Sequence, residues 1–321
     1  MINMYVIHHW DTDGICSAAK LIDIHEPENY GNITPPIGEF SFDDRIRDAL
    51  KMDDEIFIVD LNLPGVAEEL EREVTFIDHH HQPRIANRLV TQINPLLSGG
   101  SPEDYPSATA VISEFFGSWD LLSVLGAVGD VGKMALENGR IRMALEGSPL
   151  DMEQVSRLVE LIDSNYISMD RLGVESAVSA VLEEDPLELL ENREWNDKLE
   201  KVKNSVEEAL SSITELNGFA YIEMRTGLNI ISKVARKATW ELGYPGAIVV
   251  NRDFNGKAQT YFRIRDNLEE SMDLPSLIEK LRSIGVNAGG KKVVVGSVYE
   301  KERMDEVLSL IKDTAGIDRE I

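Results

Sequence analysis

The sequence predicts a two-domain α/β protein whose N-terminal domain is built on a parallel sheet. The chain has 321 residues, a length that favours two domains over one. In its first half, short apolar segments alternate with helical patterns, which is typical of β-α-β units. Each apolar segment ends in aspartate or histidine residues, and ligands bind beyond the carboxyl ends of parallel strands.

Three segments of the N-terminal half are predicted strands that are buried on both faces, because their residues are almost continuously apolar. They are Tyr5–Ile7, Glu55–Val59 and Val74–Ile77. Helices are expected after them at about 14–24, 43–51 and 65–71, and Pro64 suits a first helical position.

A stretch rich in chain-breaking residues, 95–106, is predicted to be a loop. Helical patterns follow at about 107–136 and 150–183, and the acidic stretch 183–216 is expected to be a helical connection. We therefore predict a first domain, a helical connector and a second domain. Their boundaries are 1–185, 186–217 and 218–321.

The C-terminal part mixes predicted strands with helices, which indicates a second and smaller α/β domain. Its strands are expected at Ala220–Met224, Ala247–Val250, Thr260–Ile264 and Val293–Val298. Its helices are expected at about 229–241, 274–283 and 302–313.

Charge is distributed unevenly along the chain. Asp and Glu number 57 against 32 Lys and Arg, and the net charge of −25 by itself argues against nucleic acid or an anionic membrane as ligand. Residues 1–217 hold 42 acidic and 16 basic residues, whereas 218–321 hold 15 and 16. Within 225–265, eight basic residues stand against two acidic ones. This pattern indicates either an ordinary mixed surface or a C-terminal part that meets an anionic ligand.

Composition excludes several classes of protein. The hydrophobic fraction of 43% and the charged fraction of 28% are those of a globular protein with a sizeable core. One cysteine, Cys16, rules out a disulfide framework and a cysteine-based zinc site. No apolar run approaches the ~20 residues that span a bilayer, so no membrane partner is expected. These features predict a cytoplasmic protein.

Five of the six histidines lie in two short runs at the ends of predicted strands, His8-His9 and His79-His80-His81. Aspartates accompany them: Asp11, Asp13, Asp60, Asp78 and, after an apolar helical run, Asp130. Singly, each has an ordinary explanation as a turn, helix cap or surface residue. Together, carboxylates and imidazoles at one sheet edge suit divalent metal ions, with imidazole shifting the preference from Mg²⁺ towards Mn²⁺. Two ions ~3.5–4 Å apart need about six ligands, which this set supplies.

The segments resemble the four motifs of the DHH phosphoesterases, a superfamily that includes RecJ-like nucleases, nanoRNA and cyclic-dinucleotide phosphodiesterases and type II pyrophosphatases. The stretch from His9 to Ala18 resembles the first motif, in the RecJ-like form with a histidine two residues before the first aspartate. Ile58-Val59-Asp60 resembles the second, Asp78-His79-His80 the third and Gly126–Asp130 the fourth.

The resemblance implies a role for each residue. His9 and Asp11 would hold one Mn²⁺, with Mg²⁺ as the alternative ion. Asp13, His79 and Asp130 would hold a second ion, and Asp60 would bridge the two. His80 would orient or protonate the substrate phosphate, and Asp78 would fix an imidazole. His8, His81 and Cys16 have no implied role, and we expect His8 and Cys16 to be structural.

The C-terminal part resembles the DHH-associated substrate-binding domain. The residues expected to contact substrate are Arg263, Arg265, Asn287, Gly289, Gly290 and Lys291. Lys291 stands where the family has the histidine of a Gly-Gly-His motif, so a point charge replaces an imidazole. The same segment nearly spells a P-loop, but Lys292 replaces the required Ser or Thr and a predicted strand follows, so we reject an NTPase.

The resemblance implies a Mn²⁺-dependent phosphodiesterase that releases mononucleotides from an end of single-stranded DNA or RNA. Compact archaeal members imply 3′→5′ action on DNA, a role in repair, and a helicase or replication protein as partner. A homo-oligomer is compatible with the sequence. Two alternatives stay open: a nanoRNA or cyclic-dinucleotide phosphodiesterase with the same chemistry, and a non-catalytic scaffold in a replication or repair assembly.

Overall fold

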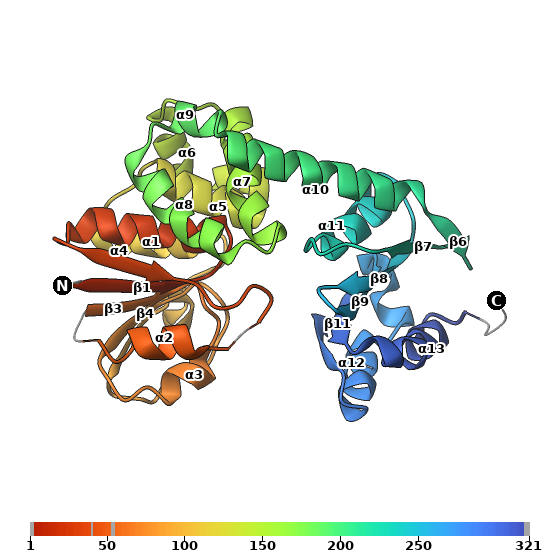
Figure 1. Ribbon diagram of the computed structural model, residues 1–321. Coiled ribbons are helices and arrows are strands. Elements are labelled where there is room, and N and C mark those ends of the chain that lie inside the picture. The colour runs from red at the N-terminus through yellow and green to blue at the C-terminus, as the bar shows by residue number, and fades with distance from the viewer. Residues whose placement is uncertain (1–2, 40, 53–54, 318–321) are drawn as a thin grey trace. The chain divides into compact units, whose positions relative to one another are not determined.

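The computed structural model describes residues 3–39, 41–52 and 55–317, so the outermost residues of both predicted domains lie outside the described part. The chain divides into two compact units, Met1–Leu199 and Glu200–Ile321. The division lies in helix α10 (Arg193–Ser211), inside the stretch predicted to be a connector. Figure 1 shows the elements of each unit.

The first unit is built on a five-stranded, all-parallel sheet with the order β2-β1-β3-β4-β5. Its strands are β1 (Met4–His8), β2 (Tyr30–Ile33), β3 (Glu55–Val59), β4 (Val74–Ile77) and β5 (Val90–Ile93). The α/β prediction and the three predicted strands are confirmed. The two edge strands, β2 and β5, were not predicted, because each is four residues long and carries polar residues at positions that are not buried.

Helices cover both faces of this sheet, which makes three layers (Figure 1). Alternate strand residues face opposite sides: Val6 and Phe57 pack in one core cluster, and Ile7 and Ile58 pack in another. On the first face, α1 (Thr12–His25), α4 (Ala108–Phe116) and α8 (Arg171–Glu183) contact the sheet, and α5 (Leu121–Val131) and α7 (Met152–Ile167) pack against α1 in the same core. The second face is covered by α2 (Asp44–Ala49) and α3 (Pro64–Glu68). The remaining elements are η1 (Pro95–Ser98), η2 (Gly132–Glu137), α6 (Gly139–Glu146) and α9 (Pro186–Leu190).

The two long helices expected at 107–136 and 150–183 are each interrupted. Gly117 adopts a left-handed conformation (φ 73°) that ends α4, and Asp120 then caps α5 with its side chain. Met169 is likewise left-handed (φ 59°) between α7 and α8, and Asp170 caps α8. Apolar periodicity continues across both breaks, so it did not reveal them. The predicted loop at 95–106 contains the short helix η1.

The second unit is a six-stranded mixed sheet with the order β10-β11-β9-β8-β7-β6, in which β7 and β8 alone among the described strand pairs run parallel. Its strands are β6 (Thr214–Leu216), β7 (Phe219–Met224), β8 (Gly246–Phe254), β9 (Lys257–Ile264), β10 (Asn287–Lys291) and β11 (Val294–Tyr299). Helices α12 (Leu274–Ser283) and α13 (Met304–Thr314) pack on one face, over Phe262 and Ile264. Helix α11 (Ile231–Arg236) packs against β8 and β9 and continues into a π-helical turn, η3 (Lys237–Glu241). Two short helices complete the unit, η4 (Asp266–Ser271) and η5 (Lys301–Arg303).

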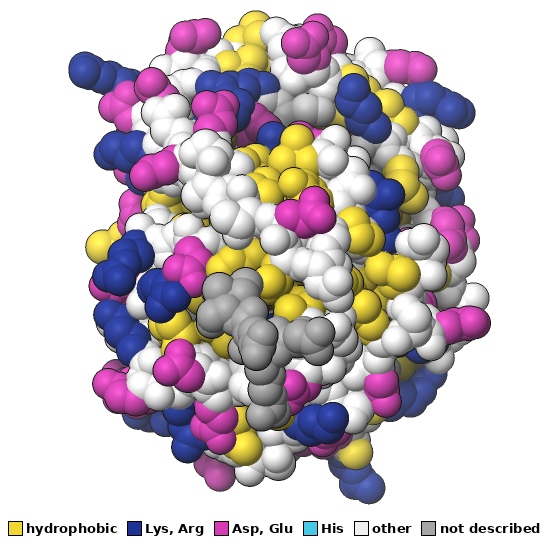
Figure 2. Space-filling view, turned by 90° about the vertical axis from the view of Figure 1, so that its right-hand side faces the viewer, with side chains coloured by type: hydrophobic (Ala, Val, Ile, Leu, Met, Phe, Trp, Pro, Cys, Tyr) yellow, Lys and Arg dark blue, Asp and Glu magenta, His cyan; other side chains and the backbone are white. Residues whose placement is uncertain are grey.

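Acidic and basic side chains are interspersed on the face that Figure 2 shows, with hydrophobic side chains between them. On this face the acidic side chains do not form a continuous anionic surface. None of the helices in the described residues is long and apolar enough to cross a bilayer.

The fold carries a testable electrostatic constraint at Lys20. This side chain is fully buried on α1, and its Nζ donates a 2.6 Å hydrogen bond to Asp120 Oδ2. Burial lowers the pKa of Lys20, and the Asp120 carboxylate opposes that shift. We expect Asp120→Asn, which keeps a residue able to cap α5, to lower the free energy of unfolding by about 3 kcal/mol, because it leaves a buried charge unpaired.

Chemical denaturation measures this effect. Asp48→Ala, which removes the partner of the exposed Lys51, is the control and should cost less than about 1 kcal/mol. Lys20→Met combined with Asp120→Asn should recover most of the loss, since the unpaired charge is gone. If Asp120→Asn lowers the free energy of unfolding by no more than the control does, the buried Lys20–Asp120 pair does not have the role given to it here.

Candidate metal centre

The carboxyl ends of β1 and β3 form the switch point of the first sheet. Because the chain moves from β1 outward to β2 and then back to β3 on the other side, β1 and β3 meet at a switch point, where open α/β sheets bind ligands. We call the space beyond the carboxyl ends of these two strands the crevice. His8 lies opposite Val59 in the register of this pair, so the next residues, His9 and Asp60, leave the sheet side by side. Both predicted ligands therefore lie in the crevice.

Asp60 has a left-handed backbone, with φ 56°, directly after β3. Its N–H donates to the Ile77 carbonyl at 3.0 Å, which ties the turn to β4, and its side chain is 2% exposed. Non-glycine residues adopt this conformation rarely, and such residues are common at functional sites. The turn directs a buried carboxylate into the crevice.

The start of α1 explains the Asp-x-Asp-Gly pattern. Asp11 caps the helix: its Oδ1 accepts a hydrogen bond from the Gly14 N–H at 3.1 Å, and its Oδ2 lies 2.7 Å from His9 Nδ1. A Cβ on Gly14 would overlap the His9 backbone, so only glycine permits this close approach. One carboxylate thus serves both the helix and the crevice.

Asp13 is fully buried in the first turn of α1, where it meets the N-terminus of α4. Its Oδ2 accepts the Ala108 N–H at 2.6 Å and its Oδ1 accepts the Thr109 N–H at 3.0 Å. Free N–H groups and the helix dipole stabilise an anion at such a position. Gly126 of α5 packs against this contact, and a Cβ there would overlap Thr109 and Asp13.

His79 follows β4 and faces two carboxylates. Its Nε2 lies 3.2 Å from Asp130 Oδ2, which comes from α5, and 3.5 Å from Asp60 Oδ1. Among the described residues, this buried nitrogen has no hydrogen-bond partner, whereas a hydrogen bond with the backbone of Tyr105 holds the side chain. A buried ring nitrogen that faces carboxylates in this way suits a metal ligand.

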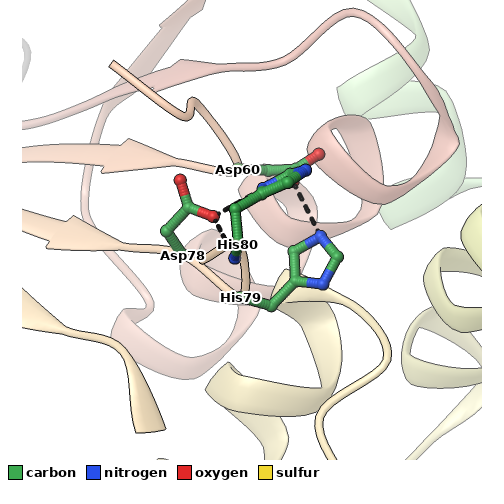
Figure 3. Close-up of side chains that lie close together, drawn as sticks. All are labelled: Asp60, Asp78, His79 and His80. Carbon is green, nitrogen blue, oxygen red and sulfur yellow. Dashed lines mark hydrogen bonds and ion pairs between the residues drawn. The ribbon is translucent and has the colours of Figure 1, made fainter. Parts of the chain in front are cut away.

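Asp78 and His80 form a separate pair beside Asp60. Asp78 Oδ1 accepts hydrogen bonds from the His80 backbone N–H at 2.8 Å and from His80 Nδ1 at 2.7 Å (Figure 3). Asp78 is fully buried, whereas the His80 side chain is 43% exposed. Asn94 donates to the His80 carbonyl at 2.8 Å. Asp78 therefore orients an imidazole that solvent and ligands can reach.

The structure brings the six residues predicted to bind metal into two groups. His9, Asp11 and Asp60 form one, and Asp13, His79 and Asp130 form the other, with the potential ligand atoms of each group within 4.8 Å of one another. Asp60 belongs to the first group and also lies 3.5 Å from His79 of the second. The arrangement thus has the form expected of two ion sites that share one carboxylate.

The electrostatics of the site fit cations. Burial and the charges of Asp13 and Asp11 raise the pKa of Asp60 well above its usual range, and burial with the same two charges does so for Asp130. Burial and the Asp11 charge raise the pKa of Asp13 to about 6, although amide hydrogen bonds act against the shift. Carboxylates at this density repel one another unless a cation lies between them.

The pKa values of the two neighbouring imidazoles, His79 and His80, shift in opposite directions. Burial and the neighbouring His80 lower the pKa of His79 to about 4, so His79 is neutral and able to act as a ligand. Burial lowers the pKa of His80, but the hydrogen bond and charge of Asp78 outweigh it and the net shift is upward. For Asp11, burial acts to raise the pKa, but the charge and hydrogen bond of His9 overcome it and lower the pKa to about 2.

His8, His81 and Cys16, for which no role in the site was predicted, lie in different surroundings. His8 is buried, with Nδ1 2.7 Å from the His9 carbonyl and Nε2 3.1 Å from Asn32 Oδ1, and burial lowers its pKa. His81 is exposed. Cys16 is buried on α1, and burial raises its pKa.

The residues predicted to contact substrate lie in the second unit. Asn287, Gly289, Gly290 and Lys291 are in the edge strand β10, which the sequence analysis did not predict. Arg265 donates from Nε and Nη2 to the Thr239 carbonyl at 3.1 and 2.7 Å, so its guanidinium already serves the protein's own backbone and its substrate contact stays a prediction. Arg263 lies over the ring of Trp240.

Two supporting interactions of the site were not predicted. Asp163 of α7 accepts hydrogen bonds from the Thr12 N–H at 3.0 Å and its hydroxyl at 2.7 Å, which holds the first turn of α1. The amides of α4 that hold Asp13 were also missed. Ser107 before an apolar run is a signal for that helix start, but nothing in the sequence links Asp163 to Thr12.

The close approach at Gly126 makes a prediction. We expect Gly126→Ala to displace Asp13, lower the free energy of unfolding by about 1–3 kcal/mol and weaken the binding of Mn²⁺. Thermal unfolding and calorimetric titration with Mn²⁺ measure the two effects. Gly139→Ala, at the open start of α6, is the control and should be neutral or slightly stabilising. Unchanged Mn²⁺ binding in Gly126→Ala would contradict the role given to this glycine.

Part of the first unit matches a known protein family. Residues 3–125 match the family described as the DHH family, N-terminal domain. The search of curated proteins finds no match.

Solved structures share the fold over almost the whole chain. The DHH domain of a protein described as a member of a family of ribosomal proteins has a TM-score of 0.72 at 16% identity, covering 99% of this chain and 87% of that one. Exonuclease RecJ bound to manganese has 0.67 at 17%, covering 98% and 90%. The pGpG-specific phosphodiesterase PggH from Vibrio cholerae has 0.54 at 14%, covering 99% and 100%. The chain shares its fold with these structures, and its residues 3–125 match the N-terminal domain of the DHH family.

Proposed function

We propose that this protein is a Mn²⁺-dependent phosphodiesterase that removes mononucleotides from single-stranded nucleic acid. The observation that carries the proposal is the pair of donor groups joined through Asp60. RecJ, which shares the fold, is an exonuclease solved with manganese. By the resemblance to compact archaeal members of the family, we propose DNA as the substrate and 3′→5′ as the direction.

The donor set suits two divalent ions of the Mn²⁺ or Mg²⁺ type, since it combines four carboxylates with two imidazoles. His9 and Asp11 would hold one ion, Asp13, His79 and Asp130 the other, and Asp60 both. Two ions bound there supply a water molecule of lowered pKa and neutralise charge that develops on the phosphoryl oxygens.

The protein's own residues give the reaction its geometry. Asp78 fixes the His80 ring through Nδ1, so the remaining ring nitrogen, Nε2, is left for the substrate. The raised pKa of His80 favours the imidazolium, which can donate a hydrogen bond to a phosphate oxygen or a proton to the departing oxygen. The Ala108 and Thr109 amides keep Asp13 in place without adding charge.

The second unit is proposed to hold the substrate chain. Arg263 and Lys291 would supply positive charge there, and Gly289 and Gly290 place no side chain between a phosphate and the backbone of the edge strand β10. Asn287 at the start of the same strand is the remaining proposed contact.

A shorter substrate is the second candidate. PggH, a pGpG-specific phosphodiesterase, is covered over its full length by this chain, so the fold accommodates a dinucleotide enzyme of the same size. The chemistry at the metal centre would be identical, and substrate length decides between the two.

One assay panel tests the proposal. The purified protein is incubated with Mn²⁺ and 5′- or 3′-labelled single-stranded DNA and RNA, a dinucleotide, cyclic di-AMP and pyrophosphate. We expect mononucleotides from single-stranded DNA, with the 3′ label released first. Preference for the dinucleotide would favour the second candidate. Hydrolysis of none of them would favour the non-catalytic scaffold and contradict the proposed activity.

Two variants test the site assignment. Asp60→Ala and His79→Ala should each lower the hydrolysis rate at least about a hundredfold, because each disrupts metal binding worth several kcal/mol at the transition state. Mn²⁺ should raise the unfolding temperature of the wild type but much less that of Asp60→Ala.

The matched control is His81→Ala, which changes an exposed histidine of the same run and should retain the wild-type rate. Circular dichroism checks that each variant folds. A near-normal rate in either ligand variant would show that the site is misassigned.

A further inference from the structure

An exposed tryptophan in the second unit is stacked against an arginine. The Arg263 guanidinium carbon lies 4.3 Å from the centroid of the Trp240 ring. Trp240 is 59% exposed, whereas Trp10 and Trp195 are 6% and 5% exposed. Burying an indole ring is strongly favourable, so one left this exposed is available to a ligand.

The backbone fixes Trp240 in this position. It lies in the π-helical turn η3, a rare conformation that is frequent at functional sites. The preceding residue, Thr239, is buried, and its carbonyl accepts both hydrogen bonds from Arg265. The Tyr244 N–H donates to the Ala238 carbonyl at 3.2 Å and closes the turn from the other side. The ring is therefore held on a rigid support.

Arg263 is positioned without a partner for its charge. No hydrogen bond or ion pair of its guanidinium occurs within residues 3–39, 41–52 and 55–317, and its Nε is buried and unsatisfied. Two nearby arginines are engaged: Arg265 with the Thr239 carbonyl, and Arg252 with the Glu223 carboxylate. A buried unsatisfied donor is costly, and a guanidinium fork matches the oxygens of a phosphate.

The sheet register adds a second charge on the same face. Arg263 of β9 lies opposite Val294 of β11, and Val294 lies opposite Lys291 of β10, so the three side chains share one face. In the next row, Tyr261 lies opposite Gly296, and Gly296 lies opposite Gly289. In this row the Tyr261 ring lies over Gly296, and Gly289 adds no side chain, so the sheet beside Lys291 stays open to a ligand.

We propose that Trp240 is a base-stacking residue of the substrate site, and that it holds the nucleobase next to the phosphate bound by Arg263. The inference rests on the proposed function and adds that the substrate must carry a base at this position. The guanidinium covers one face of the indole and the exposed remainder accepts a base, so the three groups form a stack with cation–π character. Such stacking is tolerant of sequence, which suits an enzyme that shortens any strand.

Binding under conditions without hydrolysis tests the proposal. The full chain is titrated in EDTA with single-stranded oligodeoxythymidylate, and separately with an abasic oligomer of the same length. Trp240→Ala should raise the Kd for oligodeoxythymidylate about tenfold, the size of one lost base stack, and leave the Kd for the abasic oligomer unchanged. Trp240→Phe should recover most of the affinity. Arg263→Ala should weaken both ligands and lower the salt dependence of binding by about one phosphate contact.

The control is Leu242→Ala, which removes a neighbouring apolar side chain that is 53% exposed and should change neither Kd. The inference is overturned if Trp240→Ala weakens the binding of both oligomers equally, or of neither. Loss of self-association in sedimentation, with unchanged oligonucleotide binding, also overturns it and makes Trp240 a protein contact.

The outcome is separate from that of the proposed function. Base-dependent binding through Trp240 in a protein that hydrolyses no substrate would support the inference and contradict the proposed activity. If the wild type is an active exonuclease and the Trp240→Ala variant binds and hydrolyses DNA equally well, the proposed activity is supported and the inference about Trp240 is contradicted.

Discussion

The main physical constraint on the first unit is the repulsion among carboxylates gathered at the switch point of its sheet. Asp13 and Asp60 are buried, and the Asp130 side chain, which is 22% exposed, lies beside them. Desolvation and the neighbouring carboxylates raise the pKa of all three. A core of this kind is tolerable only when protons or cations neutralise it. The parallel sheet brings these residues together, because adjacent strands must end at the same edge. The fold therefore creates an electrostatic cost that the proposed pair of metal ions would remove.

Helix ends position the charged residues. Asp11 caps α1 with one oxygen and leaves the other towards His9, while the amides of α4 hold both oxygens of Asp13. In both cases a backbone dipole fixes a carboxylate without introducing a lysine or arginine that would compete with a metal ion. Gly14 and Gly126 are required because the helices approach the ligands too closely for a side chain. The site is thus fixed by backbone contacts from elements far apart in sequence.

The second unit handles charge differently. Its acidic and basic residues nearly balance, and Arg252 and Arg265 are engaged with other groups of the protein. Within the described residues, Arg263 combines a buried, unsatisfied Nε with a position over the exposed Trp240 ring, and this local arrangement distinguishes it. The net charge of the chain is therefore a poor guide to its ligand, because a ligand contacts a local arrangement of groups. An unsatisfied donor beside an exposed ring is more informative than the sign of a segment.

The sequence by itself determined the α/β class, the central strands and the set of acidic and histidine residues, because continuous apolar runs and polar strand ends are local signals. It did not reveal the edge strands, the breaks at Gly117 and Met169, or the strand formed by Asn287–Lys291, since short polar segments carry little periodicity. Arg263 and Arg265 are two residues apart in sequence, and only the tertiary structure showed that their guanidinium groups have different surroundings. Their surroundings differ because the Thr239 carbonyl is within reach of one guanidinium and an exposed indole is within reach of the other, and such neighbours are set by packing.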